Sequence, residues 1–120
     1  MPTPSRWRIE FYPPGDPGPW LKSLRALKDD DAAGDIALQL QELADVGPFE
    51  LLSQQRVKKL TGTRGQLFEL RVHKGRHFRV IFTRRGQELW VLMLLVKKTP
   101  QLSKQDLQTA LQRAAQLPLN

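Results

Sequence analysis

The residues of this chain best suited to chemistry are cations and a histidine in its second half. Arg71, His77 and Arg79 fall in a stretch of alternating polarity, and Lys97 and Lys98 follow a later apolar run. Planar guanidinium groups match phosphate oxygens, and fixed cations stabilise negative charge that develops in a transition state. RNA supplies its own nucleophile, the 2′-hydroxyl, so its cleavage needs only a proton acceptor, a proton donor and positive charge. The spacing by itself predicts phosphate binding rather than cleavage.

Composition narrows the kinds of site that are possible. The 120 residues include no cysteine, which excludes disulfides, thiolate metal sites and thiol nucleophiles. We predict neither a metal nor a cofactor. The net charge of +7 is uneven, because residues 1–50 hold five Lys or Arg against nine Asp or Glu, whereas residues 51–120 hold fourteen against three. The asymmetry favours a polyanionic partner for the second part, and the alternative is a solvated basic face without a ligand.

The alternating residues on either side of a short turn predict a β-hairpin whose apolar rows share one face. The register that keeps those rows together puts Arg71 opposite Arg79 and His73 opposite His77. Two guanidinium groups that face each other across a sheet repel, and a bound phosphate would reverse the sign of that interaction. Glu69 on the same face can bridge and orient both arginines, or form a surface salt bridge of little energetic value.

The same periodicity extends the cationic face beyond the hairpin. Lys97 is expected on the arginine face, with Lys98 beside it at the end of the strand. For a histidine on an exposed strand face such as His77, the simpler interpretation is that it has no catalytic role. A pair of lysines is likewise most often solvated surface. Because Arg79 is expected on an exposed face, Arg79→Ala should abolish activity and leave the fold intact. The residues expected to contact RNA are Lys58, Lys59, Glu69, His73, Lys74, Arg76, Arg84 and Arg85.

The elements that must position these side chains suggest one α+β domain spanning residues 1–120. Apolar periodicity and stop signals predict a strand at 6–12, a helix at 17–27, and a second helix from 29 to the stop at Gly47 and Pro48. We expect these two helices to form an antiparallel hairpin. Four strands in an antiparallel meander are predicted at 57–60, 67–72, 77–83 and 89–97, followed by a helix that starts at Ser103. The last strand is apolar at both parities, so both its faces should be covered.

The first residues and the apolar runs do not resemble a secretory signal or a membrane-spanning helix. The first eight residues lack the apolar stretch of a secretory signal, and the longest apolar run, residues 89–96, is too short to span a bilayer as a helix. We therefore expect a cytoplasmic protein without membrane contact.

Residues 58–114 resemble the RelE/HigB toxins of bacterial toxin–antitoxin systems, especially their phage-derived branch. The pieces that carry the resemblance are KKL at 58–60, LFELR at 67–71, FRVIF at 78–82 and an apolar strand that ends in KKT at 97–99. The helix that follows also fits. These pieces cover about half the chain, and the upstream strand and helix pair match the layout of the family without a sharp motif.

The resemblance implies a RelE-like fold and a ribosome-dependent endonuclease that binds the ribosomal A site. Messenger RNA would be cleaved by attack of a 2′-hydroxyl on the adjacent phosphate. By motif, Arg79 takes the place of the arginine in the strand before the apolar one, and Arg71 belongs to the ELR element. Lys97 or Lys98 takes the place of the basic residue that ends the last strand, whereas Lys58 and Lys59 match the upstream lysines.

The chain departs from some relatives in one respect that concerns catalysis. It lacks a tyrosine near the start of the last helix, since the only tyrosine is Tyr12. His77 or a lysine is therefore left as the candidate proton acceptor. Other members of the family poison DNA gyrase without cutting RNA or have degraded sites, so a non-cleaving gyrase poison or inactive adaptor is the alternative function.

The resemblance also implies partners. These are messenger RNA, the 70S ribosome and a cognate antitoxin, which in the HigB-like branch is expected to be a helix-turn-helix DNA-binding protein. Met93 and Leu95 share the parity of Arg79. Apolar surface is therefore expected beside the cationic face, as a groove for a partner segment would require.

Overall fold

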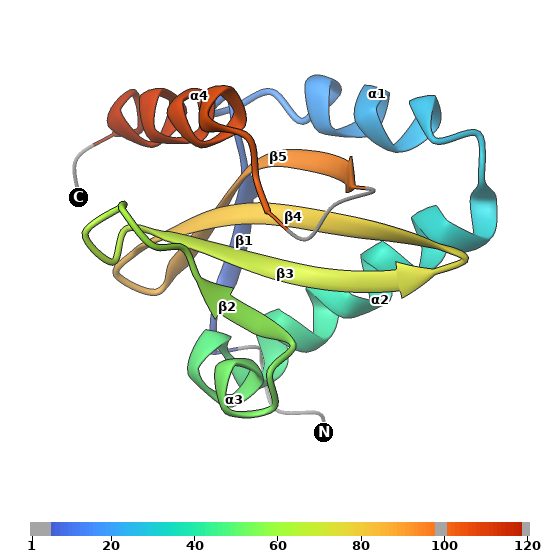
Figure 1. Ribbon diagram of the computed structural model, residues 1–120, viewed down its shortest axis with the longest axis horizontal. Coiled ribbons are helices and arrows are strands. Elements are labelled where there is room, and N and C mark those ends of the chain that lie inside the picture. Colours follow the sequence, from blue (N-terminus) through green and yellow to red (C-terminus); the bar gives the residue numbers. More distant parts are fainter. Residues whose placement is uncertain (1–5, 98–100, 119–120) are drawn as a thin grey trace.

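A five-stranded sheet forms the centre of the molecule, and helices pack on both of its faces (Figure 1). The computed structural model describes residues 6–97 and 101–118. In chain order the elements are β1 (Arg8–Phe11), α1 (Gly18–Ala26), α2 (Asp30–Val46), α3 (Pro48–Ser53), β2 (Val57–Lys59), β3 (Leu67–Lys74), β4 (Arg76–Arg85), β5 (Glu88–Lys97) and α4 (Lys104–Ala115). The mixed α+β class agrees with the prediction.

The strands follow the order β1-β5-β4-β3-β2. Strands β2 to β5 form the predicted antiparallel meander. The prediction of an antiparallel sheet throughout is wrong, because β1 pairs with β5 in parallel and makes the sheet mixed. The partner of β1 lies about eighty residues away in sequence, so the local pattern of apolar residues does not indicate whether the two strands pair in parallel or antiparallel. Strand β5 lies between β1 and β4, which agrees with its apolar residues at both parities.

Two hydrophobic clusters occupy the two faces of the sheet. On one face, Ile36, Leu40 and Leu43 of α2 pack with alternate residues of β3 and β4. On the other face, Ala110 and Ala114 of α4 pack over residues that include Leu67, Ile81, Trp90 and Leu92. Helix α4 therefore covers part of the sheet face on which parity places the arginines.

The helices differ from the prediction in two ways. Helix α1 packs against β5, whereas α2 packs against β1 and β3, so the two do not form the expected antiparallel hairpin. Trp20 of α1 stacks on Phe11 of β1, with ring centroids 5.1 Å apart. The short helix α3 is absent from the sequence-based prediction, which assigns Pro48 only to the end of the preceding helix. Gly47 ends α2, and Pro48 then starts α3, since proline suits a first helical turn.

Two of the predicted helix starts are confirmed by their caps. The Asp29 side chain accepts a hydrogen bond from the backbone N–H of Ala32 at 3.0 Å. The Ser103 hydroxyl accepts one from the backbone N–H of Asp106 at 3.0 Å. Such caps satisfy donors that the first turn of a helix leaves unpaired. None of the helices in the described part of the chain is long and apolar enough to cross a membrane.

Candidate functional site

The β3–β4 hairpin has the predicted register. Arg71 lies opposite Arg79, and His73 lies opposite His77. The two imidazole rings stack with centroids 4.3 Å apart and an interplanar angle of 2°. Apolar residues of both strands alternate with these four and belong to the opposite face. The strand parity that the sequence suggested thus gathers the arginines and histidines on one side of the sheet.

A single carboxylate joins the two arginines. Oε1 of Glu69 accepts a hydrogen bond from Nε of Arg71 at 2.8 Å, and Oε2 accepts one from Nη1 of Arg79 at 3.1 Å. The Glu69 side chain is 1% exposed, that of Arg79 10% and that of Arg71 43%. The carboxylate lowers the repulsion between the facing guanidinium groups and fixes their orientation. The bridging role predicted for Glu69 is confirmed, and the pair is buried rather than a surface salt bridge.

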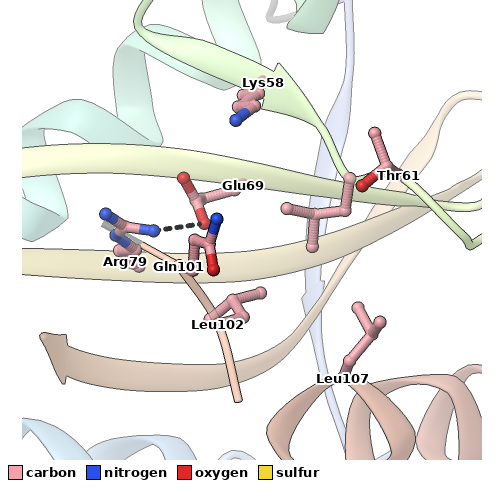
Figure 2. A pocket seen from close by; sticks show the side chains of 8 residues that line it. Lys58, Thr61, Glu69, Arg79, Gln101, Leu102 and Leu107 are labelled. Atoms are coloured by element: carbon pink, nitrogen blue, oxygen red, sulfur yellow. Dashed lines mark hydrogen bonds and ion pairs between the residues drawn. The ribbon is translucent and has the colours of Figure 1, made fainter. Parts of the chain in front are cut away.

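The prediction that Arg79 lies on an exposed face is wrong. Arg79 is buried, and its cross-strand neighbour on β5 is Leu95. Figure 2 shows Gln101 and Leu102, from the segment that leads into α4, beside the Arg79–Glu69 pair. Strand parity identifies the face of a residue but not a helix that packs on that face. Replacement of Arg79 should therefore affect stability as well as any activity.

A cavity of about 330 Å³ opens beside the buried ion pair (Figure 2). Its lining consists of Lys58, Leu60, Thr61, Glu69, Arg79, Gln101, Leu102 and Leu107. Lys58, Arg79 and the carboxylate of Glu69 form one side of the cavity. Leu60, which follows β2, forms another side together with Leu102 and Leu107 of the α4 region. An anionic group could bind on the polar side while an apolar or flat group packs on the leucines. Sequence reasoning missed Thr61 and Gln101, because each is a lone polar residue outside any strand.

Lys97 lies on the predicted face but is bound to α4. Its register partner is His77, and its Nζ donates to Oδ2 of Asp106 at 2.7 Å. The hydrogen bond from Lys97 holds the pKa of Asp106 below its ordinary value, and a further one from Ser103 acts in the same direction. Lys97 does not line the cavity. The role of Asp106 was missed because its sequence context indicated only a helix cap, and Lys98 lies outside the described residues.

The two lysines of β2 lie on different faces. Lys58 pairs with Glu69 and lines the cavity, whereas Lys59 pairs with Phe68, which packs in the opposite core cluster. A second hollow, of about 340 Å³, lies at this sheet edge beside α3. Its lining is Leu52, Gln55, Val57, Lys58, Lys59 and Arg71. Of these two residues expected to contact RNA, only Lys58 therefore lines the cavity beside Arg79.

The cations at the turn do not join the Glu69 site. Arg76 stacks over Phe78 at 5.2 Å and donates to the carbonyl of Leu27 at 3.3 Å, which directs it toward α1 and α2. Lys74 is its cross-strand partner and shares that direction by parity.

The arginines at the far end of β4 are also engaged elsewhere. Arg84 stacks on Trp7 and Phe49, with its guanidinium 5.5 Å from each ring. Arg85 donates to the carbonyl of Ala114 at 3.1 Å, near the C-terminal end of α4. Neither lines the cavity. Of the eight residues predicted to contact RNA, only Lys58 and Glu69 line the cavity, whereas His73 stacks on His77 farther along β3.

One further prediction about this face needs revision. Met93 and Leu95 are partly buried and pack in the cluster beneath α4, so the expected groove for a partner is largely filled. Tyr12 is hydrogen-bonded to Gln116, and Arg113 stacks over its ring at 5.4 Å. Tyr12 thus lies at the end of α4 and outside the cavity. Within residues 6–97 and 101–118, no group of three or more His, Cys, Asp or Glu is placed to hold a metal ion.

Comparison with known families decides the membership of the chain. Residues 21–115 match the model of a family described as phage-derived Gp49-like proteins (DUF891). The chain belongs to the Gp49-like family. Gp49-like proteins fall within the RelE/HigB-like toxins in general, and the match runs from α1 to the end of α4, so it includes Glu69, Arg71, Arg79 and Lys97. Among curated proteins, none matches the chain.

Proposed function

We propose that this Gp49-like protein is a toxin that cleaves messenger RNA on the ribosome and thereby stops translation. The observation that supports the proposal is the buried Glu69–Arg79 pair at the wall of a cavity that Lys58 also lines. A fixed guanidinium beside an open, partly apolar cavity can bind a backbone phosphate while the adjoining nucleoside packs on the leucines. Membership of a toxin-like family gives the biological context.

The proposed reaction is transfer of the phosphoryl group to the RNA's own 2′-hydroxyl. The 2′-oxygen bonds to phosphorus as its proton passes to an acceptor, the bond to the 5′-oxygen breaks, and that oxygen takes up a proton. The products are a 2′,3′-cyclic phosphate and a 5′-hydroxyl end. Arg79 would stabilise charge on the phosphoryl oxygens, and Glu69 would hold its guanidinium in place.

The proton acceptor has two candidates. Lys58 lines the cavity, whereas His77 lies on the same face as Arg79 and two residues before it on β4, about 7 Å away along the strand. A general base must reach within hydrogen-bond distance of the proton it removes. Measuring the cleavage rate of the Lys58→Ala and His77→Ala variants as a function of pH distinguishes the two candidates, because only loss of the proton acceptor should alter the pH dependence of the reaction.

The proposal is tested on ribosomes programmed with a defined message. The protein is added, and the ends of the message are mapped by primer extension. We expect new ends within the ribosome-bound segment, and a loss of about 10²–10³-fold in rate for Arg79→Lys, which keeps the charge but not the planar fork. Lys59→Ala serves as the control from the other face. Intact message on these ribosomes, together with arrested growth of cells that produce the protein, would rule out cleavage.

A non-cleaving module is the second candidate function, and specific contacts favour it. Both oxygens of Glu69 are engaged by arginines, and Lys97 is engaged by Asp106. The same cationic face could then bind a polyanion or a partner without chemistry, as a gyrase poison or an inactive adaptor would. DNA breaks and a DNA-damage response after induction would indicate gyrase poisoning, whereas an adaptor should produce neither breaks nor cut messages.

The proposed toxin would act in the cytoplasm, with messenger RNA and the 70S ribosome as its targets. A cognate antitoxin, expected to be a helix-turn-helix protein, would neutralise it. Co-expression of the product of the adjacent gene tests this partnership, because restored growth requires that product to bind or repress the toxin.

A further inference from the structure

Helix α2 and the adjoining α3 expose three large apolar side chains to solvent. Leu38 on α2 is 70% exposed, Val46 at the end of α2 is 45% exposed, and Phe49 on α3 is 48% exposed. Single exposed leucines are ordinary on protein surfaces. Here, however, three of the five exposed large hydrophobic side chains in the described part of the chain lie within twelve consecutive residues. The concentration suggests a surface that is covered by another molecule.

The charge around Leu38 is predominantly negative. Helix α2 carries five Asp or Glu and no Lys or Arg, although the whole chain has a net charge of +7. Positions three, four and seven residues from Leu38 share its side of the helix. Those positions hold Asp31, Gly34, Asp35, Gln41, Glu42 and Asp45. Glu42 is paired with Arg56 at 2.7 Å, which leaves three aspartates as the net charge beside Leu38. An apolar side chain with aspartates on its flanks complements a partner whose apolar stripe is flanked by Lys and Arg.

Gly34 adds a separate indication from backbone energetics. It lies inside α2 and is exposed, and a Cβ added there would meet nothing within 4 Å. Alanine would favour the helix at such a position, so no contact within the chain explains the glycine. With exposed Ala37 beside it, Gly34 leaves the helix backbone open on the side of Leu38. Two helices approach most closely where the side chains between them are small.

We propose that the exposed face of α2, centred on Gly34 and Leu38, docks an amphipathic helix of a partner protein whose leucine-like stripe is flanked by Lys and Arg. A nucleic acid is disfavoured as the occupant because the face is acidic. Helix α2 packs on the sheet face opposite to the one that bears Glu69 and Arg79. The proposal therefore goes beyond RNA cleavage and does not depend on it.

A synthetic helical peptide with one leucine stripe and Lys and Arg on its flanks serves as the probe. Amide NMR spectra of the full chain are recorded during titration with this peptide and with a matched peptide that carries Glu on its flanks. We expect shifts confined to residues on the exposed side of α2 and to the start of α3, with the basic peptide alone. Shifts centred on α1 or on the sheet, equal binding of the acidic peptide, or no binding would overturn the proposal.

Variants identify the surface independently of the spectra. Leu38→Asp removes the central apolar group, and Gly34→Leu fills the open backbone without a clash at its Cβ. Each should weaken peptide binding about tenfold or more. Leu21→Asp is the matched control, because Leu21 is 42% exposed on the separate helix α1. Equal loss in Leu21→Asp, or unchanged affinity in Leu38→Asp with a native spectrum, would overturn the proposal, and cleavage by Leu38→Asp should equal that of the parent.

Discussion

Nη1 of Arg79 lies 3.1 Å from Oε2 of Glu69, and both side chains are almost wholly removed from solvent. Burial of a carboxylate is costly unless hydrogen bonds to cations compensate for the lost water. Glu69 has two such partners, one buried and one partly exposed, because Arg71 occupies its other oxygen. The pair therefore belongs to the packing of the fold and to the wall of the cavity at once.

The first prediction concerns stability. Arg79→Ala should lower the free energy of unfolding by about 1–3 kcal/mol, because it leaves a buried carboxylate oxygen without its charged donor while Arg71 still holds the other. Urea unfolding of the purified variant measures the change. Arg8→Ala is the control, because Arg8 pairs with Glu88 while its own side chain is 70% exposed, and its loss should stay below about 1 kcal/mol. An Arg79→Ala variant as stable as the parent would mean that water replaces the guanidinium.

The second prediction separates two lysines that sequence alone treats as a pair. Lys58 lines the cavity on the Glu69 face, and Lys59 lies on the other face. If RNA binds at the cavity, Lys58→Ala should weaken binding of a single-stranded RNA and reduce the dependence of log K on log salt by about 0.7. Lys59→Ala should change both quantities less. Fluorescence anisotropy over a series of salt concentrations tests this, and equal effects would argue against the cavity as the binding site.

Local periodicity was sufficient for the part of the fold that carries the arginines. Alternation of Phe68, Leu70 and Val72 fixed the buried face of β3, and a short turn then left one register that places Arg71 opposite Arg79. The same parity put Glu69 on the arginine face and allowed a bridge between the arginines as one of two interpretations. These relations depend only on neighbours within one hairpin, so sequence reasoning could reach them.

Contacts between distant segments account for what the sequence could not predict. The parallel pairing of β1 depends on β5, and the buried Arg79 lies beside Gln101 and Leu102 of the segment that leads into α4. The engagement of Lys97 by Asp106 requires the same helix. Parity identifies a face, whereas only the tertiary arrangement decides what covers it.

The third prediction concerns acid stability. The hydrogen bond from Lys97 lowers the pKa of Asp106 from its ordinary value of 3.8. Because the folded pKa lies below the unfolded one, the ionised carboxylate stabilises the fold at pH above 3.8, and this contribution is lost as the pH falls through the folded pKa. Asp106→Asn should therefore be less stable than the parent near neutral pH, and the difference should shrink below about pH 4. Thermal unfolding of both proteins across this range measures it, and a constant difference would contradict the assigned ion pair.

The fourth prediction concerns the junction between α2 and α3. Gly47 has φ of 89° and ψ of 163°, and an added Cβ would lie 2.5 Å from Nε1 of Trp7. Residues other than glycine rarely adopt this conformation, and the indole leaves no room for a methyl group. Gly47→Ala should therefore lower the free energy of unfolding by about 1–3 kcal/mol.

Gly34→Ala is the matched control, because a Cβ there meets nothing within 4 Å and the change should stabilise the helix by up to about 1 kcal/mol. Equal urea midpoints for the two variants would mean that Trp7 does not pack over Gly47.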